Sequence, residues 1–441
     1  MPSIFNKILA PLRKNSLQHL LANMGHMVFE NVLKLFVGFF VSIWVARELG
    51  PERFGHFNYV ISFCTLFAPF FVMGVDDLQT KELVEKPKET DEIMANILAI
   101  KILGGIIGIT FCIGISQFLQ IEIDSILPLI YLYSLFQFSK IFDVINTWFL
   151  SQIKAKTVTV GRNIILILSA GLKAYCLLTQ KDWNFFVYIS CFDLAALGFF
   201  YLLAYRLEGK VLKPTLMTSK KMKTYFRTCL PLFMILLFTM AIAKIDHLMI
   251  QDFLGSTELG KYSAAVKLVD LWHFIPIAIV STLFPRLIAA NQVSISRYQN
   301  HKLTILSLMF WSGTIFALVV SLLSSPIINL LYGQKYLGSD EILKCYAWLA
   351  IFVFLTFVRV KIFLMQNRTY DGVLLLSIIL VHNVLFNYLL IPRYGTKGAV
   401  IASIAAYLAA DILLSIFHKN LRESFKDIFR ATVHPLEKIR N

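Results

Sequence analysis

The 441-residue sequence predicts an all-α integral membrane protein, with about 12 transmembrane helices in two parallel-repeat six-helix bundles around a central cavity. The composition, the length of the apolar runs and an internal repeat support this fold class. Hydrophobic residues make up 57% of the chain and charged residues only 16%. A soluble domain cannot bury so much apolar surface, because its own outside must be wetted.

The apolar runs have the length of spanning helices. A helix needs roughly 20 apolar residues to cross the hydrocarbon core, and its backbone groups must be hydrogen-bonded within the segment. Strands of a membrane barrel need only about ten alternating residues. The predicted spans are 24–46, 57–75, 94–118, 126–150, 161–180, 184–205, 228–251, 262–285, 303–325, 342–365, 371–391 and 398–417.

Lysine and arginine residues in the connecting segments indicate the orientation of the chain. With the N-terminus inside, the inside segments hold 26 of the 42 basic residues, and the outside loops hold seven. Because basic residues are retained on the cytoplasmic side, we predict that both termini are cytoplasmic. The same bias accounts for the net charge of +15 without a nucleic-acid partner.

This topology divides the chain into five segments. Residues 1–23 form an amphipathic cytoplasmic lead-in, and residues 24–205 form the N-terminal six-helix bundle. A basic cytoplasmic linker, 206–227, joins it to the C-terminal six-helix bundle, 228–417, and a basic cytoplasmic tail, 418–441, follows.

An internal repeat relates the two bundles. The nonapeptides LGPERFGHF at 49–57 and LGSTELGKY at 254–262 share a leucine and two glycines at an offset of 205 residues. Glycine at both fixed positions suits a tight turn between helices. With six predicted spans between the copies, the bundles have the same orientation, which indicates a parallel repeat about an axis along the membrane normal.

Charged residues inside the predicted spans are the candidates for function. A charge near the bilayer centre costs at least about 2.5 kcal/mol, so these side chains must face water or one another. Nine are basic and six are acidic, which predicts a wet cavity with a cationic bias that suits an anionic passenger. The candidate substrate-binding residues are Lys34, Lys140, Lys267 and Arg359, and the candidates for ion coupling or for positioning those cations are Glu30, Asp143, Asp246, Asp270 and His273.

A structural alternative stays open for several of these residues. Pairs three or four residues apart share a helix face, so Lys140 with Asp143, or Lys267 with Asp270, could join helices without touching substrate. For His273, a packed and hydrogen-bonded position in the core is favoured over a role as a proton carrier. Lys101 lies near a span end, where its side chain could reach the interface.

We predict no catalytic residue, no metal site and no cofactor, and therefore no enzyme. The six cysteines lie in apolar runs and form no C-x-x-C pair, which is typical of buried small hydrophobic residues. The sequence has no G-x-x-x-x-G-K-[ST] motif for ATP, and its predicted loops are too short for a catalytic domain. Coupling to H⁺ or Na⁺ through carboxylates such as Asp246 or Asp270 stays open.

Six segments between about residue 25 and residue 417 carry a resemblance to a known family. They are VARELGPERFGHFNY at 45–59, KIDHLMI at 244–250, GKYSAAVKLVDLW at 260–272, IPIAIVSTLFP at 275–285, LYGQKYLG at 331–338 and NYLLIPRYGTKGAV at 387–400. These segments resemble Wzx-type polysaccharide flippases, which belong to the multidrug/oligosaccharidyl-lipid/polysaccharide exporter (MOP) superfamily.

The resemblance implies a V-shaped pair of bundles that moves an undecaprenyl-pyrophosphate-linked oligosaccharide by alternating access. The movement would run from the cytoplasmic to the periplasmic leaflet of the bacterial inner membrane, for O-antigen or another surface polysaccharide. The implied partners are this lipid-linked oligosaccharide, membrane lipid and the proteins of polysaccharide polymerisation and assembly. Cationic side chains in the cavity would offset the charge of the pyrophosphate.

Three other functions remain open at this point. A multidrug exporter of the same superfamily would be expected to have an acidic cavity for organic cations, whereas the surplus here is basic. A flippase for a peptidoglycan precursor often carries helices beyond twelve. An oligosaccharide polymerase usually has a long outside loop, which this sequence lacks.

Overall fold

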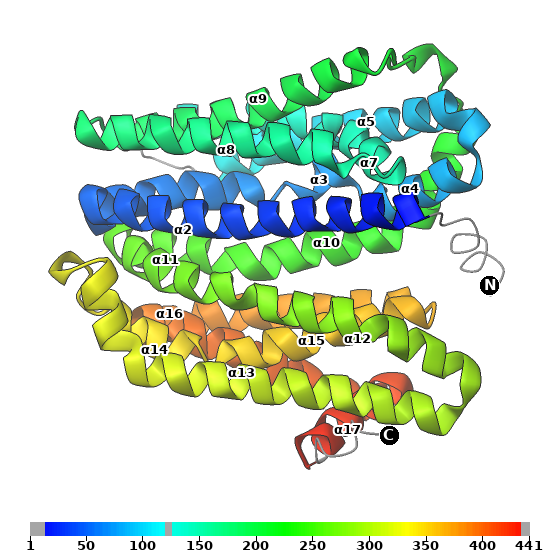
Figure 1. Cartoon of the computed structure of the whole chain (residues 1–441). Helices are drawn as coiled ribbons and strands as arrows, with labels where there is room; N and C mark the ends of the chain where they lie inside the picture. Colours follow the sequence, from blue (N-terminus) through cyan, green and yellow to red (C-terminus); the bar gives the residue numbers. More distant parts are fainter. Residues whose placement is uncertain (1–13, 120–125, 434–441) are drawn as a thin grey trace. The chain divides into compact units, whose positions relative to one another are not determined.

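The computed structural model describes residues 14–119 and 126–433, and every regular element within them is helical (Figure 1). The all-α membrane fold is thereby confirmed. The α-helices are α2 (Lys14–Thr65), α3 (Pro69–Val72), α4 (Asp76–Glu85), α5 (Thr90–Phe118), α6 (Leu127–Gln137), α7 (Asp143–Ser151), α8 (Ala155–Leu178), α9 (Asn184–Leu207), α10 (Ser219–Leu254), α11 (Ser256–Asp270), α12 (Phe274–Val293), α13 (Ile295–Leu331), α14 (Ser339–Tyr346), α15 (Leu349–Met365), α16 (Thr369–Phe417) and α17 (Lys419–Val433). Short 3-10 turns are η1 (Pro87–Glu89), η2 (Phe138–Phe142), η3 (Pro214–Leu216), η4 (Leu271–His273) and η5 (Gln334–Tyr336).

Two of the long helices are each two helices joined at a glycine. In α2, Gly50 has φ 73° and ψ 170° and is followed by Pro51. In α16, Gly395 has φ 61° and ψ −146°. These backbone angles lie outside the helical region, and glycine reaches them without the steric penalty of a side chain. Each of these two elements therefore contains residues of two predicted spans, 24–46 and 57–75 in α2 and 371–391 and 398–417 in α16.

The number of spans stays a prediction. In the described part of the chain, eight helices are long and apolar enough to cross a membrane, or nine if a bent helix pair over 36–85 is one span. The predicted span 126–150 is divided among α6, η2 and α7. Helix length alone therefore does not yield the twelve crossings that the apolar runs predict.

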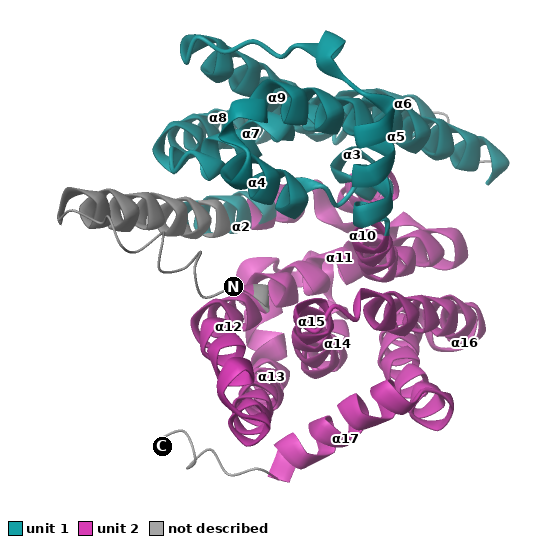
Figure 2. Cartoon of the chain, turned by 90° about the vertical axis from the view of Figure 1, so that its right-hand side faces the viewer, with its two compact units in different colours: residues 1–42, 67–230 teal, residues 43–66, 231–441 magenta. Residues whose placement is uncertain are grey.

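The chain forms two compact units (Figure 2). Unit 1 comprises residues 1–42 and 67–230, and unit 2 comprises residues 43–66 and 231–441. The division near residue 230 lies close to the end of the predicted linker. Residues 43–66, which the sequence assigned to the N-terminal bundle, group with unit 2.

The repeat explains this grouping, because its two turns pack against each other inside unit 2. A Cβ atom added to Gly55 would lie 1.8 Å from the carbonyl oxygen of Ser256, and one added to Gly260 would lie 1.8 Å from the carbonyl oxygen of Pro51. Pro51 and Ser256 are equivalent positions of the two copies, as are the two glycines, so the contact is reciprocal. The side chain of His56 adds to it, with Nδ1 3.0 Å from Ser256 Oγ.

The basic linker is held against the first turn of α5 within unit 1. Lys213 lies 2.7 Å from Asp91, and Lys221 lies 2.8 Å from both Glu89 and Glu92. The backbone N–H of Thr218 donates to Asn96 Oδ1 at 2.8 Å. Acidic residues are favoured at a helix N-terminus, where the helix dipole is positive, and here they also bind the basic linker.

Candidate functional site

A buried carboxylate, Asp246, is the centre of a polar cluster in unit 2. The residue lies in α10, and only 4% of its surface is exposed. Asn387 Nδ2 donates to Asp246 Oδ1 at 2.7 Å, and the hydroxyls of Ser403 and Tyr262 donate to Oδ2 at 2.8 and 2.9 Å. A buried charge needs such compensation, because an uncompensated ion inside a protein costs several kcal/mol.

Local structure brings these partners together. Asn383 and Asn387 are one helical turn apart on α16, so both amides lie on one face. The kink at Gly395 brings the second half of α16 back beside the first, where Asn383 Nδ2 donates to Ser403 Oγ at 2.9 Å. Tyr262 is the last residue of the second repeat copy. These four residues were not among the predicted site residues, although two amides four residues apart in an apolar run were a usable signal.

Lys267 lies near the first copy of the repeat, also within unit 2. Its Nζ is 4.7 Å from the ring centre of Phe54 and 6.0 Å from that of Phe57. Phe54 is fully buried, and a cation over an aromatic face is attracted by the negative face of the ring. The contact between the two repeat turns therefore also brings Lys267, a predicted substrate cation, next to the aromatic rings of the first copy. Asp270, at the end of α11, is exposed.

Arg359 is held inside unit 2. It is 2% exposed, its Nη1 lies 2.6 Å from Asp411 Oδ1 on α16, and its Nε donates to Ser424 Oγ on α17 at 3.0 Å. These contacts favour a structural role in joining α15, α16 and α17. The predicted role in substrate binding is untested and stays a prediction.

A second polar cluster lies in unit 1 and is richer in cations. The Nζ atom of the fully buried Lys101 lies 2.7 Å from Asp76 Oδ1, so this side chain does not extend to the interface. The charged side chains with the largest electrostatic effect on Asp143 are Lys101, Asp76, Lys140 and Arg162. We call these five residues the unit 1 cluster. Asp76 and Arg162 were not among the predicted site residues. Asp76 lies one residue beyond the predicted span 57–75, and Arg162, at the start of the predicted span 161–180, was counted with the basic residues of the cytoplasmic loop before it.

Two of the three cations of the unit 1 cluster contact neutral side chains. Arg162 donates from Nη2 to Asn146 Oδ1 at 3.1 Å, and Lys140 Nζ lies 3.4 Å from Gln137 Oε1. Lys140 is in η2, the 3-10 segment that separates α6 from α7. The predicted grouping of Lys140 with Asp143 is consistent with this arrangement.

Three predicted site residues cannot be placed by their side chains. Glu30 and Lys34 belong to α2 and His273 to η4, but their side chains lie outside the described residues. Their predicted roles stay predictions.

Comparison with known families identifies relatives along most of the chain. A family model described as polysaccharide biosynthesis protein matches residues 20–291. The capsular polysaccharide biosynthesis protein CapF of Staphylococcus aureus is 21% identical over 412 residues, which cover 90% of this chain and 99% of that protein. The uncharacterized membrane protein MJ1068 of Methanocaldococcus jannaschii is 24% identical over 189 residues, but these cover only 42% of this chain and 37% of that protein.

Solved structures of membrane transporters share the fold. The lipid II flippase MurJ in an inward closed conformation matches with a TM-score of 0.69 at 13% identity, over 94% of this chain and 90% of that chain. An inward-facing multidrug resistance transporter of the MATE family, of the MOP superfamily, matches with a TM-score of 0.65 at 14% identity, over 90% of this chain and 96% of that chain. These comparisons confirm the family resemblance and the fold that the sequence predicted.

Proposed function

Because the chain belongs to the polysaccharide biosynthesis protein family, we propose that it is a flippase for a lipid-linked oligosaccharide. In this proposal it moves an undecaprenyl-pyrophosphate-linked repeat unit from the cytoplasmic to the periplasmic leaflet of the bacterial inner membrane by alternating access. Both termini are cytoplasmic, no chemical bond is made or broken, and the moved unit passes to the proteins that polymerise and assemble the surface polysaccharide.

The charge of the unit 1 cluster is the observation that carries this proposal. Its three cations, Lys101, Lys140 and Arg162, outnumber its two carboxylates. A pyrophosphate group is bound by lysine and arginine side chains, whereas a cavity for organic cations needs a surplus of carboxylates. The surplus supports an anionic substrate over the cationic drugs of a multidrug exporter.

Among the predicted substrate cations, Lys140 and Lys267 are the best supported. Both are only partly buried, so their charge can reach a ligand, whereas Arg359 is buried against Asp411. Lys34 remains part of the proposal on its sequence position alone. The neighbouring carboxylates Asp143 and Asp270 would position these cations.

We further propose that Asp246 carries the coupling ion. Its carboxylate lies among the oxygen-bearing side chains of Tyr262, Asn383, Asn387 and Ser403. The amide oxygen of Asn387 is buried without a hydrogen-bond partner, which gives a cation a further ligand. Oxygen ligands suit a hard cation such as Na⁺, and protonation of the carboxylate is the alternative.

Deletion of the gene in its host tests the proposed function. A flippase deletion traps complete lipid-linked repeat units on the cytoplasmic side and abolishes the surface polysaccharide. Shortened surface polymer with untrapped units would indicate a polymerase instead. Normal polysaccharide with increased sensitivity to cationic drugs would indicate a multidrug exporter.

Reconstitution then tests the substrate cations directly. Purified chain in proteoliposomes should expose a fluorescent lipid-linked oligosaccharide to a glycosidase added on the opposite side. Lys140→Gln should slow this exposure by about tenfold or more, since a charge-assisted hydrogen bond is worth about 2 kcal/mol, while Lys140→Arg should retain most of it. The matched control is Lys181→Gln, which removes an exposed lysine outside both clusters and should leave the rate unchanged.

A further inference from the structure

Helix α17 is a fixed part of unit 2. It packs against α13 and α16, and its Leu421 and Ala431 are buried. Lys302 of α13 lies 2.5 Å from Asp427 of α17, and the buried Arg359 donates to Ser424. The predicted basic tail, 418–441, therefore begins with an anchored helix.

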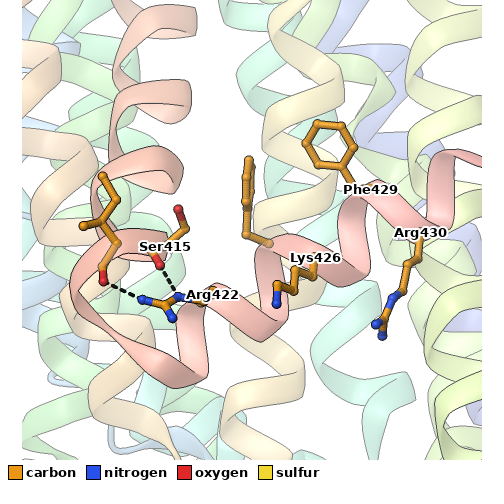
Figure 3. A pocket seen from close by; sticks show the side chains of 7 residues that line it. Ser415, Arg422, Lys426, Phe429 and Arg430 are labelled. Carbon is orange, nitrogen blue, oxygen red and sulfur yellow. Dashed lines mark hydrogen bonds between the residues drawn. The ribbon is translucent and has the colours of Figure 1, made fainter.

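The opposite side of α17 borders a groove of about 640 Å³ between this helix and the end of α16 (Figure 3). Its lining combines two kinds of side chain. Ile416, Phe425 and Phe429 supply apolar surface, and Arg422, Lys426 and Arg430 supply positive charge. Figure 3 shows Phe429 directed to one side of α17 and Lys426 and Arg430 directed to the other.

The three cations of the groove differ in what they contact. Arg422 donates to the backbone carbonyls of Ser415 and Ile416 at 2.6 and 2.7 Å, where it caps the last turn of α16. Lys426 and Arg430 are exposed, and Arg430 Nη1 lies 3.7 Å from Asp427 Oδ1. Asp427 itself is bound to Lys302, so positive charge prevails on this side of the helix.

Part of the apolar surface in and beside the groove is exposed. Phe429 is 64% exposed, and Ile416 and Phe417 at the end of α16 are 57% and 79% exposed. An exposed aromatic residue beside a row of cations is typical of a helix that lies in the membrane interface. A soluble anion would gain nothing from the phenylalanines, and an apolar peptide would gain nothing from the cations.

We propose that α17 and the end of α16 form a binding site for an anionic phospholipid. Lys426 and Arg430 bind the phosphate of the headgroup, and Phe425, Phe429 and Ile416 contact the first part of the acyl chains. In the topology proposed above, with both termini in the cytoplasm, the bound lipid belongs to the cytoplasmic leaflet, whose anionic lipids attract basic segments. This site is separate from the Asp246 cluster and from the unit 1 cluster, and it does not depend on which substrate the chain moves.

Photo-crosslinking of the full-length chain in nanodiscs tests the proposal. The discs contain phosphatidylcholine and a trace of diazirine-labelled phosphatidylglycerol or, in parallel, diazirine-labelled phosphatidylcholine with the same acyl chains. The yield of lipid adducts on the peptide 415–433 is measured by mass spectrometry. We expect a clear preference for phosphatidylglycerol, and we expect Lys426→Gln with Arg430→Gln to reduce that yield by roughly tenfold to thirtyfold, given the usual attraction of a basic residue to anionic lipid.

Two comparisons separate a lipid site from a general charge effect. Lys210→Gln with Lys220→Gln removes the same charge from exposed positions of the linker and should leave the yield on 415–433 unchanged. Phe429→Gln should lower the yield with both labelled lipids, because it removes acyl-chain contact. The proposal is overturned if the double variant keeps the wild-type yield, if the linker control loses as much, or if inorganic phosphate displaces labelled phosphatidylglycerol as well as unlabelled phosphatidylglycerol does.

Discussion

At the scale of single residues, a mutation can distinguish two roles of the buried Asp246 carboxylate, which are ion coupling and the acceptance of buried hydrogen bonds. Asp246→Asn keeps the shape of the side chain and removes its charge. We expect the variant to fold and to flip substrate at a rate that no longer responds to an H⁺ or Na⁺ gradient. Imposing each gradient separately across proteoliposomes identifies the ion.

The matched control for this experiment is Asp193→Asn. Asp193 is also an intramembrane carboxylate, but it lies in unit 1, bound to Ser169 and Lys173, and its variant should keep the response to the gradient. An Asp246→Asn variant that still responds fully would exclude coupling at this site. Asp246→Ala should be less stable by about 1–3 kcal/mol, because it leaves three buried donors without their acceptor.

Lys267 permits a second test at this scale. Lys267→Gln removes the contact with Phe54, which is worth roughly 0.5–2 kcal/mol, so we expect nearly normal membrane abundance with loss of surface polysaccharide. Lys267→Arg should retain function, because the guanidinium also stacks on an aromatic ring. Abundance is measured by immunoblot and polysaccharide by lectin binding.

The charge swap Lys267→Asp with Asp270→Lys decides between substrate binding and helix joining. It preserves any attraction between the two positions but moves the cation by about one helical turn. We expect no recovery of polysaccharide. Full recovery by the swap, together with depletion of the Lys267→Gln protein, would establish the structural role.

At the scale of helices and turns, the reciprocal glycine contact makes the sharpest prediction. Gly55→Ala and Gly260→Ala each place a methyl group 1.8 Å from a backbone oxygen, so the two turns must separate. We expect each to lose about 1–3 kcal/mol of stability, as overpacked sites do. Gly171→Ala is the control, because its added Cβ meets nothing within 4 Å and the change favours the helix. Thermal unfolding of the purified variants measures the difference, and equal melting temperatures for Gly55→Ala and Gly171→Ala would contradict the contact.

Sequence patterns predicted the elements better than they predicted the connections between them. Apolar runs of this length predict helices, because the backbone N–H and C=O groups of a segment in lipid must be hydrogen-bonded within that segment. The nonapeptide repeat indicated two equivalent turns, but periodicity cannot show that Gly55 and Gly260 pack on each other's backbones. For the same reason the grouping of residues 43–66 with unit 2 was not foreseen. It depends on a contact between segments that are distant in the sequence.

The candidate site shows a similar limit. Asp246 was found because a carboxylate inside an apolar run is costly. Its partners Asn383, Asn387 and Ser403 are neutral. A single neutral polar residue in a membrane helix does not predict a site, because such residues are common there. Only the fold reveals that they converge on one carboxylate.

At the scale of the whole molecule, the distribution of basic residues predicts which side each loop faces. Reporter fusions at Lys181, Lys261 and Lys335 should report the periplasm, and fusions at Lys156 and Lys221 should report the cytoplasm. Lys221 of the basic linker binds Glu89 and Glu92, so we expect the linker and the segment before α5 to lie on the same side. Two fusions on the wrong side would disprove the topology.

The contact between the repeat turns also has a consequence for how the chain is made. Gly55 leaves the ribosome 205 residues before Gly260, which is roughly 10 to 40 s at ordinary rates of synthesis. All residues of unit 1 are present once residue 230 has been translated. Residues 43–66, in contrast, are made before the segment of unit 2 on which they pack. The turn at Gly55 lacks its partner turn until the second copy has been made. Unit 2 is therefore the last part of the molecule to close, although one of its segments is among the first to be inserted.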